Sequence, residues 1–204
     1  MYPSSGFSIA DLVGYYERIA PILLPHLRGR PLSFRRFPAT VKDESYWEKD
    51  APAFTPTWVK TVPVPRASGE PDLHYILVED ERTLAWTASV GCVEIHPFLH
   101  CYSEITRPTS IVFDLDPGEG SGLVQCCATA LLLRDFFTNF GMKAFAKTSG
   151  AKGMQVYLPL NTAVTYTATQ VFAQRVAEKL AQERPESIVS ESSKAVRAKK
   201  VLID

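Results

Sequence analysis

Two aspartates separated by one residue are the first feature of this sequence that could do chemistry. Asp114 and Asp116 lie in IVFDLDPGEG, where the preceding apolar run is typical of a strand. Alternate side chains of a strand project from one face, so the two carboxylates are expected close together. Such a pair suits a hard divalent cation, Mn²⁺ or Mg²⁺, that also binds phosphate oxygens. The alternative is two solvated acids at a strand end.

A glycine-rich turn, KTSGAKG, follows the aspartates along the chain. Its backbone N–H groups, the hydroxyl of Ser149 and the ammonium groups of Lys147 and Lys152 could together bind a triphosphate. The motif alone is weak evidence, because it is not a P-loop and Gly-rich hairpins are common. The aspartates and the turn would together form one site, in which the aspartates bind a metal ion and the turn binds the nucleotide.

The last residue, Asp204, is a third candidate acid. It follows an apolar stretch that predicts a strand over residues 201–203, and Arg197 precedes that stretch. A third carboxylate is what a two-metal phosphoryl-transfer site requires, because the attacking and leaving oxygens are both stabilised there. Taken by itself, a final aspartate is more often a simple terminal acid.

The elements that must position these residues are expected to form an α/β fold. Ser8 is expected to cap a helix that ends near Pro21 and Pro25. The proline-dense segment 38–66 predicts a long ordered surface loop. The short turn in KTSGAKG favours antiparallel pairing of the strands around it. Further strands are expected at 31–37, 74–79, 110–115, 144–147 and 154–160, and further helices at 81–93, 123–140 and 166–182.

Composition narrows the possible classes of protein. The 204 residues are 46% hydrophobic, which is enough to bury a core within one domain. Basic and acidic residues both number 22, so nucleic-acid binding would depend on local clusters of charge. No apolar run is long enough to span a membrane and no export signal is visible. A cytoplasmic protein without a membrane partner is therefore expected.

Several ordered blocks of the sequence resemble one family. The chain looks like the primase-polymerase domain of bacterial DNA ligase D, within the archaeo-eukaryotic primase superfamily. The resemblance covers nearly the whole chain, and its blocks are YPSSGFSIADLVGYYERIAPILLPHLRGRP, SYWEKDAP, TPTWVKT, VEIHPFL, SIVFDLDPGEG, KTSGAKGMQVYLPL and SSKAVRAKKVLID. It implies a mixed, largely antiparallel catalytic sheet flanked by helices, with an N-terminal helical lobe, as a single domain over residues 1–204.

The resemblance also implies roles for individual residues. Three acids would bind the metal and carry catalysis: Asp114, Asp116 and Asp204. Residues that match the family's nucleotide contacts are Ser149, Lys152, Arg197 and His96, the last of which would reach the triphosphate. Tyr46 and Trp47 match an aromatic pair that stacks on template bases, and Lys49 lies in the same DNA-binding block.

The chain departs from the family at identifiable places. Histidine usually stands in the nucleotide site where this chain has Gln155, and glutamine keeps a neutral donor and acceptor but loses a charged form. A lysine that recognises a 5′-phosphate is usual where this chain has Ile9. Family domains also usually continue beyond the position of Asp204, so the chain is expected to lack their C-terminal part.

The expected function is DNA-directed nucleotidyl transfer in non-homologous end joining. An NTP or dNTP would be added to a primer 3′-OH at DNA gaps or breaks, beside a Ku-like protein and a DNA ligase. One alternative is a module that binds and synapses DNA ends with little polymerase activity. Another is a D-x-D phosphatase or sugar-nucleotide transferase, although Pro117 after the second aspartate argues against the phosphatase. A zinc site remains a minor alternative, with Cys92, His96, His100 and Cys101 as its ligands.

Overall fold

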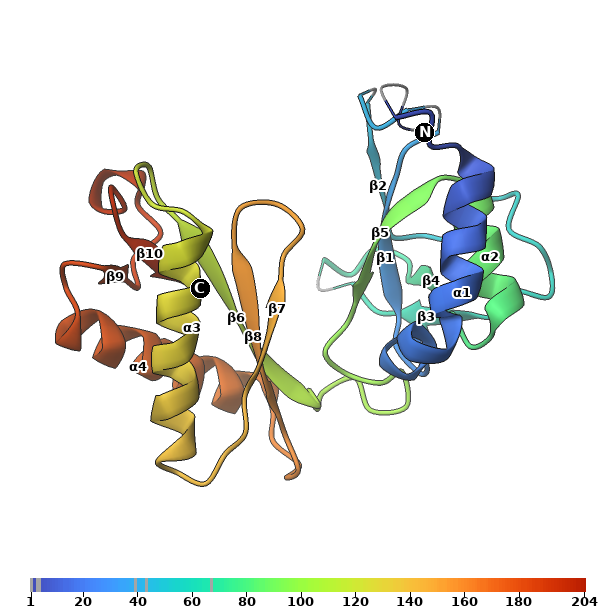
Figure 1. Cartoon of the computed structure of the whole chain (residues 1–204). Coiled ribbons are helices and arrows are strands. Elements are labelled where there is room, and N and C mark those ends of the chain that lie inside the picture. The colour runs from blue at the N-terminus through green and yellow to red at the C-terminus, as the bar shows by residue number, and fades with distance from the viewer. Residues whose placement is uncertain (1, 3–4, 39, 43, 67) are drawn as a thin grey trace. The chain divides into compact units, whose positions relative to one another are not determined.

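The computed structural model describes residue 2 and residues 5–38, 40–42, 44–66 and 68–204, apart from the side chain of Lys194. The chain divides into two compact units, Met1–Ile105 and Thr106–Asp204, each with its own apolar core (Figure 1). None of the helices in the described part of the chain is long and apolar enough to cross a membrane. The prediction of a single domain over residues 1–204 stays a prediction.

The first unit packs two helices against a five-stranded antiparallel sheet. Helices α1 (Ile9–Leu27) and α2 (Glu81–Ser89) share a core with the sheet, and β5 (Cys92–Pro97) pairs with one side of the central strand β1 (Leu32–Arg36). The remaining strands follow in the order β2-β1-β4-β3, with β2 at Tyr46–Glu48, β3 at Thr61–Val64 and β4 at Leu73–Ile76. The N-terminal part is thus built on a sheet as well as on helices.

Helix α1 begins where its capping residues require. Ser8 accepts a hydrogen bond from the backbone N–H of Asp11, and the Asp11 carboxylate accepts one from the Ser8 backbone. The expectation that the helix ends near its prolines was wrong, because it continues to Leu27 with Pro21 and Pro25 inside it. A proline removes only its own N–H from the helix, and buried Ala20, Leu24 and Leu27 anchor the remaining turns in the core.

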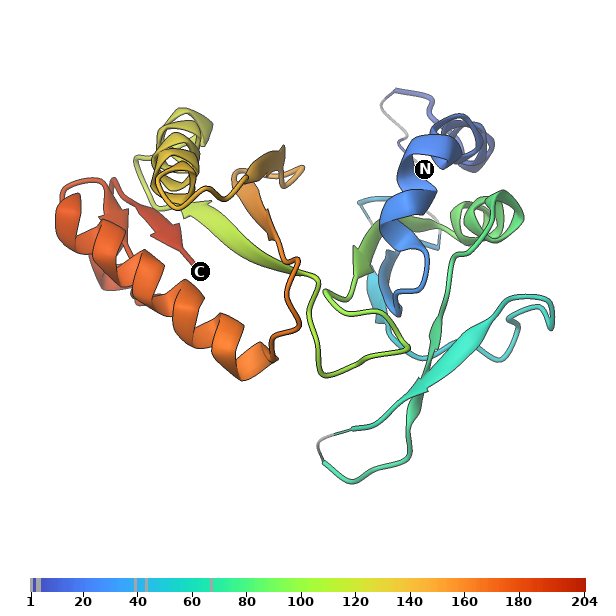
Figure 2. The same ribbon diagram turned by 90° about the horizontal axis from the view of Figure 1, so that it is seen from below.

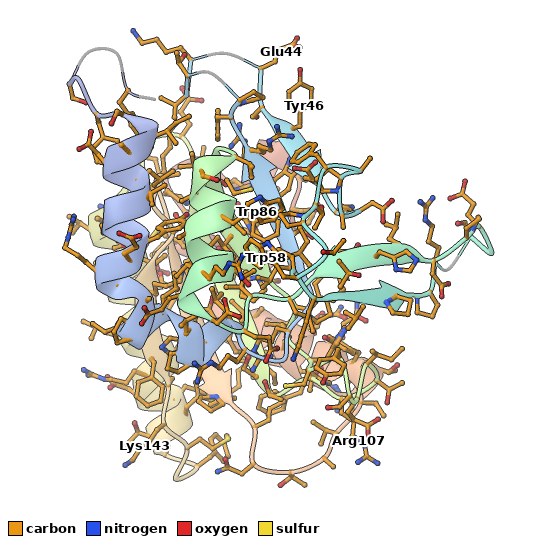
Figure 3. The ribbon with its side chains drawn as sticks, turned by 90° about the vertical axis from the view of Figure 1, so that its right-hand side faces the viewer. Glu44, Tyr46, Trp58, Trp86, Arg107 and Lys143 are labelled. Carbon is orange, nitrogen blue, oxygen red and sulfur yellow. The ribbon has the colours of Figure 1, made fainter. Side chains whose placement is uncertain are left out.

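The expected helix over residues 81–93 is shorter, because Gly91 ends it. Gly91 has φ +86°, and a Cβ at this position would lie 2.3 Å from the carbonyl oxygen of Phe37. The chain therefore turns there and enters β5, which pairs with β1. The predicted surface loop also contains two short strands, β2 and β3. Trp58 and Trp86 lie beside one another in this unit, with ring centroids 6.5 Å apart (Figure 3).

The second unit is a mixed, largely antiparallel sheet in the order β7-β8-β6-β10-β9. Its strands are β6 (Ser110–Pro117), β7 (Phe145–Thr148), β8 (Met154–Pro159), β9 (Ile188–Val189) and β10 (Val201–Ile203). Only the pair β9 and β10 is parallel among the pairs in the described residues. Helices α3 (Leu123–Thr138) and α4 (Tyr166–Glu183) pack with these strands around one core (Figure 2). The expected α/β class and catalytic sheet are confirmed.

Alternation along β6 separates this core from a polar face. Phe113 and Leu115 are buried in the core, whereas Asp114 is half-buried and Asp116 is exposed. The two aspartates consequently share the face of the sheet opposite the core.

Candidate active site

The register of the second sheet brings the third acid to the first. Asp114 and Asp204 exchange backbone hydrogen bonds, with N···O distances of 2.8 and 3.0 Å, so they lie directly opposite each other on β6 and at the end of β10. Directly opposite residues point to the same face of a sheet. The side chains of Asp114, Asp116 and Asp204 therefore belong to one face, although the last is far away in the sequence.

On the other side of Asp114 lies Gln155 of β8, which pairs with Lys147 of β7. Lys147, Gln155, Asp114 and Asp204 thus form a polar row across four strands. The Gln155 side chain lies beside that of Asp114, and its Oε1 accepts a hydrogen bond of 3.2 Å from the hydroxyl of Tyr157. Since Oε1 faces the tyrosine hydroxyl, the amide nitrogen remains to donate to Asp114.

The pKa of Asp114 is raised above the ordinary carboxyl value. Burial is the largest cause, followed by the charge of Asp116; the Gln155 hydrogen bond opposes them, Asp204 adds to the rise, and Lys147 lowers it slightly. The other two acids therefore lie close enough to Asp114 to disfavour its ionisation. A cation beside them would relieve that repulsion.

Arg197 brings such a charge to the second aspartate. Its Nη2 lies 3.6 Å from Oδ2 of Asp116, and its side chain is mostly buried. Gly118 permits this approach, because a Cβ there would lie 1.8 Å from the carbonyl oxygen of Arg197. The Nε atom of Arg197 is buried without a hydrogen-bond partner. The segment before β10 therefore places the Arg197 guanidinium beside the face of the sheet that carries the three aspartates, here called the acid face.

The KTSGAKG turn lies against the same strand. A Cβ on Gly153 would meet the carbonyl oxygen of Leu115 at 2.2 Å, so only glycine lets the hairpin approach β6 this closely. The Ser149 hydroxyl donates to the carbonyl of Gly153 at 3.1 Å and accepts from its N–H at 3.2 Å. Ser149 therefore closes the turn. Lys152 is exposed and lines a cavity of about 600 Å³, together with Ala151 and residues 117–123.

The acid face suits a divalent cation by its chemistry. Three carboxylates on adjoining positions provide the hard oxygen ligands that Mn²⁺ and Mg²⁺ prefer, and the Arg197 guanidinium occupies part of the space beside Asp116. Among the residues that the structure describes, no group of three or more His, Cys, Asp and Glu side chains is already arranged to hold an ion. Two of the acids have other partners instead: Asp114 binds Gln155 and Asp116 binds Arg197.

His96, expected to contact the nucleotide, and Trp47, expected to stack on the template, contact each other within the first unit. The rings of His96 on β5 and Trp47 on β2 have centroids 4.8 Å apart, and both side chains are about half exposed. Arg35 of β1 lies between these strands, opposite Trp47 on one side and Glu94 on the other. His96 and Trp47 thus form one partly exposed surface on the sheet of this unit.

Tyr46, from the block expected to bind DNA, lies apart from that surface. Tyr46 precedes Trp47 on β2, so the two side chains point to opposite faces, and Tyr46 stands out at the strand end (Figure 3). Lys49 follows β2 and is exposed. Cys92 and His96, two of the candidate zinc ligands, lie four residues apart on β5, with Cys92 buried and His96 exposed, so they are not arranged around one ion.

Three polar residues near these sites were not assigned to them from the sequence: Tyr157, Arg35 and Glu94. Lys147 was expected to bind the triphosphate as part of the KTSGAKG turn and not to lie on the acid face. Strand alternation could have placed Lys147 and Tyr157 on the acid face, because both lie in motifs flanking Gln155. Arg35 and Glu94 come from segments far apart in the chain. Their meeting depends on the pairing of β1 with β5, which no local pattern reveals.

Comparisons with known proteins agree with this geometry. The family model described as "LigD, primase-polymerase domain" matches residues 9–204. The chain is 33% identical to the multifunctional non-homologous end joining protein LigD of Mycolicibacterium smegmatis, over 100% of this chain and 27% of that protein. It is 32% identical to the bifunctional LigD of Bacillus subtilis, over 89% of this chain and 29% of that protein. The chain thus spans about a quarter of the length of these relatives.

A solved structure is similar over the whole chain. It is the polymerase domain from Mycobacterium tuberculosis Ligase D in complex with DNA, with a TM-score of 0.92 and 32% identity, covering 100% of this chain and 73% of that one. The resemblance drawn from the sequence blocks is confirmed. The chain belongs to the LigD primase-polymerase family.

Proposed function

We propose that the chain is a DNA-directed nucleotidyltransferase of non-homologous end joining. It adds NTPs or dNTPs to a primer 3′-OH at DNA gaps or breaks and releases pyrophosphate. The observation that carries the proposal is the direct pairing of Asp114 with Asp204, beside Asp116, on the polar face of the second sheet. Family membership and the similarity to a polymerase domain bound to DNA support the reaction class.

Asp114, Asp116 and Asp204 would hold the metal, Mn²⁺ or Mg²⁺. A bound divalent ion neutralises charge on the phosphates and favours the deprotonated primer hydroxyl. The protein's own groups orient the nucleotide. Lys152 and Arg197 supply positive charge for the triphosphate, and the Ser149 hydrogen bonds fix the shape of the turn that presents Lys152.

The remaining residues are assigned to the nucleotide and the DNA. Gln155 holds Asp114 from the neighbouring strand and donates without charge. His96 contacts the triphosphate, Trp47 and Tyr46 offer aromatic surfaces to template bases, and Lys49 pairs with DNA phosphate. Because Tyr46 and Trp47 point to opposite faces of β2, they would act on different nucleotides.

The names of the relatives motivate the proposed partners. Proteins called non-homologous end joining proteins act on DNA ends, so a Ku-like protein and a DNA ligase are the proposed partners of this chain. DNA as substrate would place it with the nucleoid. The neutral net charge predicts modest DNA affinity that falls with added salt.

Primer extension tests the function. A labelled primer on a gapped, 5′-phosphorylated duplex is incubated with Mn²⁺ or Mg²⁺ and single NTPs or dNTPs, and the wild type is compared with Asp114→Ala/Asp116→Ala. Extension by the wild type alone is expected. DNA and nucleotide binding without extension in the wild type would refute catalysis and favour an end-binding module.

A further inference from the structure

His96 is held by a chain of polar contacts that runs from β5 across β1 to Ser45, the residue before β2. Its Nε2 lies 3.2 Å from Oε2 of Glu94. The other carboxylate oxygen of Glu94, Oε1, accepts a hydrogen bond of 3.1 Å from Nη1 of Arg35. Nε of Arg35 in turn donates to the hydroxyl of Ser45 at 2.9 Å. All four residues lie within the first unit, so the arrangement depends on that unit alone.

Strand pairing positions these residues, in addition to the hydrogen bonds between their side chains. Arg35 and Glu94 are direct partners across β1 and β5, and His96 lies two residues beyond Glu94 on the same strand. Glu94 and His96 therefore project from the same face. The ring of Trp47 packs against the imidazole from the opposite side of β1, with the two ring planes inclined by 59°. Nε2 of the imidazole therefore contacts Glu94, and one side of the ring packs against Trp47.

Stability does not account for these contacts. The side chains of Arg35, Glu94 and His96 remain between 40% and 47% exposed, and ion pairs at such exposure contribute little to folding. Their geometry has a different consequence, because each oxygen of Glu94 has its own donor. The carboxylate can accept from Arg35 and from His96 at the same time, and this sets which imidazole nitrogen carries hydrogen.

We propose that Glu94, itself held by Arg35, is a positioning residue that fixes the imidazole of His96 for contact with a phosphate group. The inference rests on the proposed function, in which His96 binds the nucleotide triphosphate. Glu94 accepts a hydrogen bond from Nε2–H of His96, which leaves Nδ1 to face the ligand. Nδ1 donates to a phosphate oxygen only when the ring carries both hydrogens, so the contact is charge-assisted, with Glu94 as the counter-charge.

The substitution Glu94→Gln is predicted to change which nitrogen of His96 carries the hydrogen. Arg35 has only donors, so the amide oxygen of the new glutamine turns toward Arg35 and its NH₂ group turns toward Nε2 of His96. Nε2 must then accept, and the hydrogen of the neutral ring moves to Nδ1. His96 can still donate to a phosphate, but without charge. The KM for the nucleotide is expected to rise about tenfold, with kcat changing less than about twofold.

Nitrogen-15 NMR of the histidine side chains tests the tautomer directly. The sequence has four histidines, and His96→Gln identifies the signals of His96. The wild type is expected to show hydrogen on Nε2, and Glu94→Gln is expected to show it on Nδ1. Glu17→Gln makes the same chemical change at an exposed site on α1 and should alter neither spectrum nor KM. Thermal unfolding shows that each variant is folded.

The outcomes separate the inference from the function on which it rests. A shift of the tautomer together with a higher KM in Glu94→Gln supports the positioning role. If His96→Gln raises KM but Glu94→Gln leaves tautomer and KM as in the wild type, Glu94 does not position His96. If His96→Gln leaves KM unchanged, His96 does not bind the triphosphate, and the proposed function loses that contact while metal-dependent extension stands.

Discussion

At the scale of single residues, Asp114 is the acid whose surroundings most directly shape the site. It lies between Gln155 and Asp204 on neighbouring strands, and its pKa is raised by burial and by the other acids. Such a carboxyl stabilises the folded chain while it is protonated. That contribution is complete below the pKa of the unfolded chain and is lost as the pH rises through the higher folded value.

Asp114→Asn therefore raises the stability of the protein at pH 7 in metal-free buffer. Removing the charge relieves the repulsion from Asp116 and Asp204, and we expect Tm to rise by about 2–4 °C. Thermal unfolding followed by circular dichroism at pH 7 and at about pH 3.5 measures the effect, which should vanish at the lower pH because the wild-type carboxyl is then protonated. Asp72→Asn, on an exposed loop, is the control and should change nothing. A lower Tm at pH 7 would contradict the assignment.

Arg197 is expected to weaken the binding of Mn²⁺ alone and to strengthen the binding of Mn²⁺ together with a nucleotide. Its guanidinium lies 3.6 Å from Asp116, so its charge opposes a cation at the acids, whereas it attracts a triphosphate. Arg197→Gln should strengthen binding of Mn²⁺ alone by about threefold to tenfold and weaken binding of Mn²⁺ with an NTP. Electron paramagnetic resonance of free Mn²⁺ measures both affinities. Arg175→Gln, exposed on α4, is the matched control; two effects of the same sign would refute this account.

Sequence patterns identified the acids and the turn, because D-x-D on a strand and a glycine-rich turn are local features. The partners that hold them are not local. Gln155 was assigned to the nucleotide, but its contact with Asp114 follows from the pairing of β6 with β8. The contact of Arg197 with Asp116 likewise needs the close backbone approach at Gly118.

At the scale of elements, glycines determine how closely the strands and turns approach. Gly153 lets the hairpin β7–β8 lie against β6, and Gly91 turns the chain from α2 into β5. The first two residues of β5 were mistaken for part of a helix, because the residues before Gly91 are helical and the apolar pattern continues beyond it. Strands β2 and β3 are short and lie in a proline-rich segment, so their pairing with β1 and β4 outweighs a local sequence that favours a loop.

Gly153→Ala tests this close approach. The added Cβ would meet the Leu115 carbonyl oxygen at 2.2 Å, so the hairpin must move away from β6. We expect a loss of about 2–4 kcal/mol in the free energy of unfolding, measured by urea denaturation, and weaker Mn²⁺ binding. Gly14→Ala, inside α1 with its nearest neighbour at 3.5 Å, should instead stabilise by about 0.5–1 kcal/mol. An unchanged stability in Gly153→Ala would show that the contact is dispensable.

At the scale of the whole molecule, the two units carry different parts of the proposed chemistry. The acids, Arg197 and the KTSGAKG turn belong to Thr106–Asp204, whereas His96 and the aromatic residues belong to Met1–Ile105. Each unit has its own core, with Phe113 and Leu133 in one and Phe34 and Leu84 in the other. The family resemblance implied a helical N-terminal lobe, and the structure adds to it a sheet of short strands paired at long range.

A fragment of residues 106–204 is expected to fold and to bind Mn²⁺ with an affinity similar to that of the whole chain. Its core and all three acids are contained within that unit. Cooperative thermal unfolding and Mn²⁺ titration test this expectation, and primer extension should be lost because His96 and Trp47 are missing. A fragment that shows no cooperative unfolding would show that the second unit depends on the first.

The most direct test of the central claim is the effect of Asp204→Asn on Mn²⁺ binding and on primer extension in the same samples. The claim is that β6 and β10 pair so that Asp204 completes one metal site with Asp114 and Asp116. We predict that Asp204→Asn keeps the fold, weakens Mn²⁺ binding at least about tenfold and abolishes extension on gapped DNA. A folded Asp204→Asn protein that binds Mn²⁺ and extends the primer like the wild type would contradict the account.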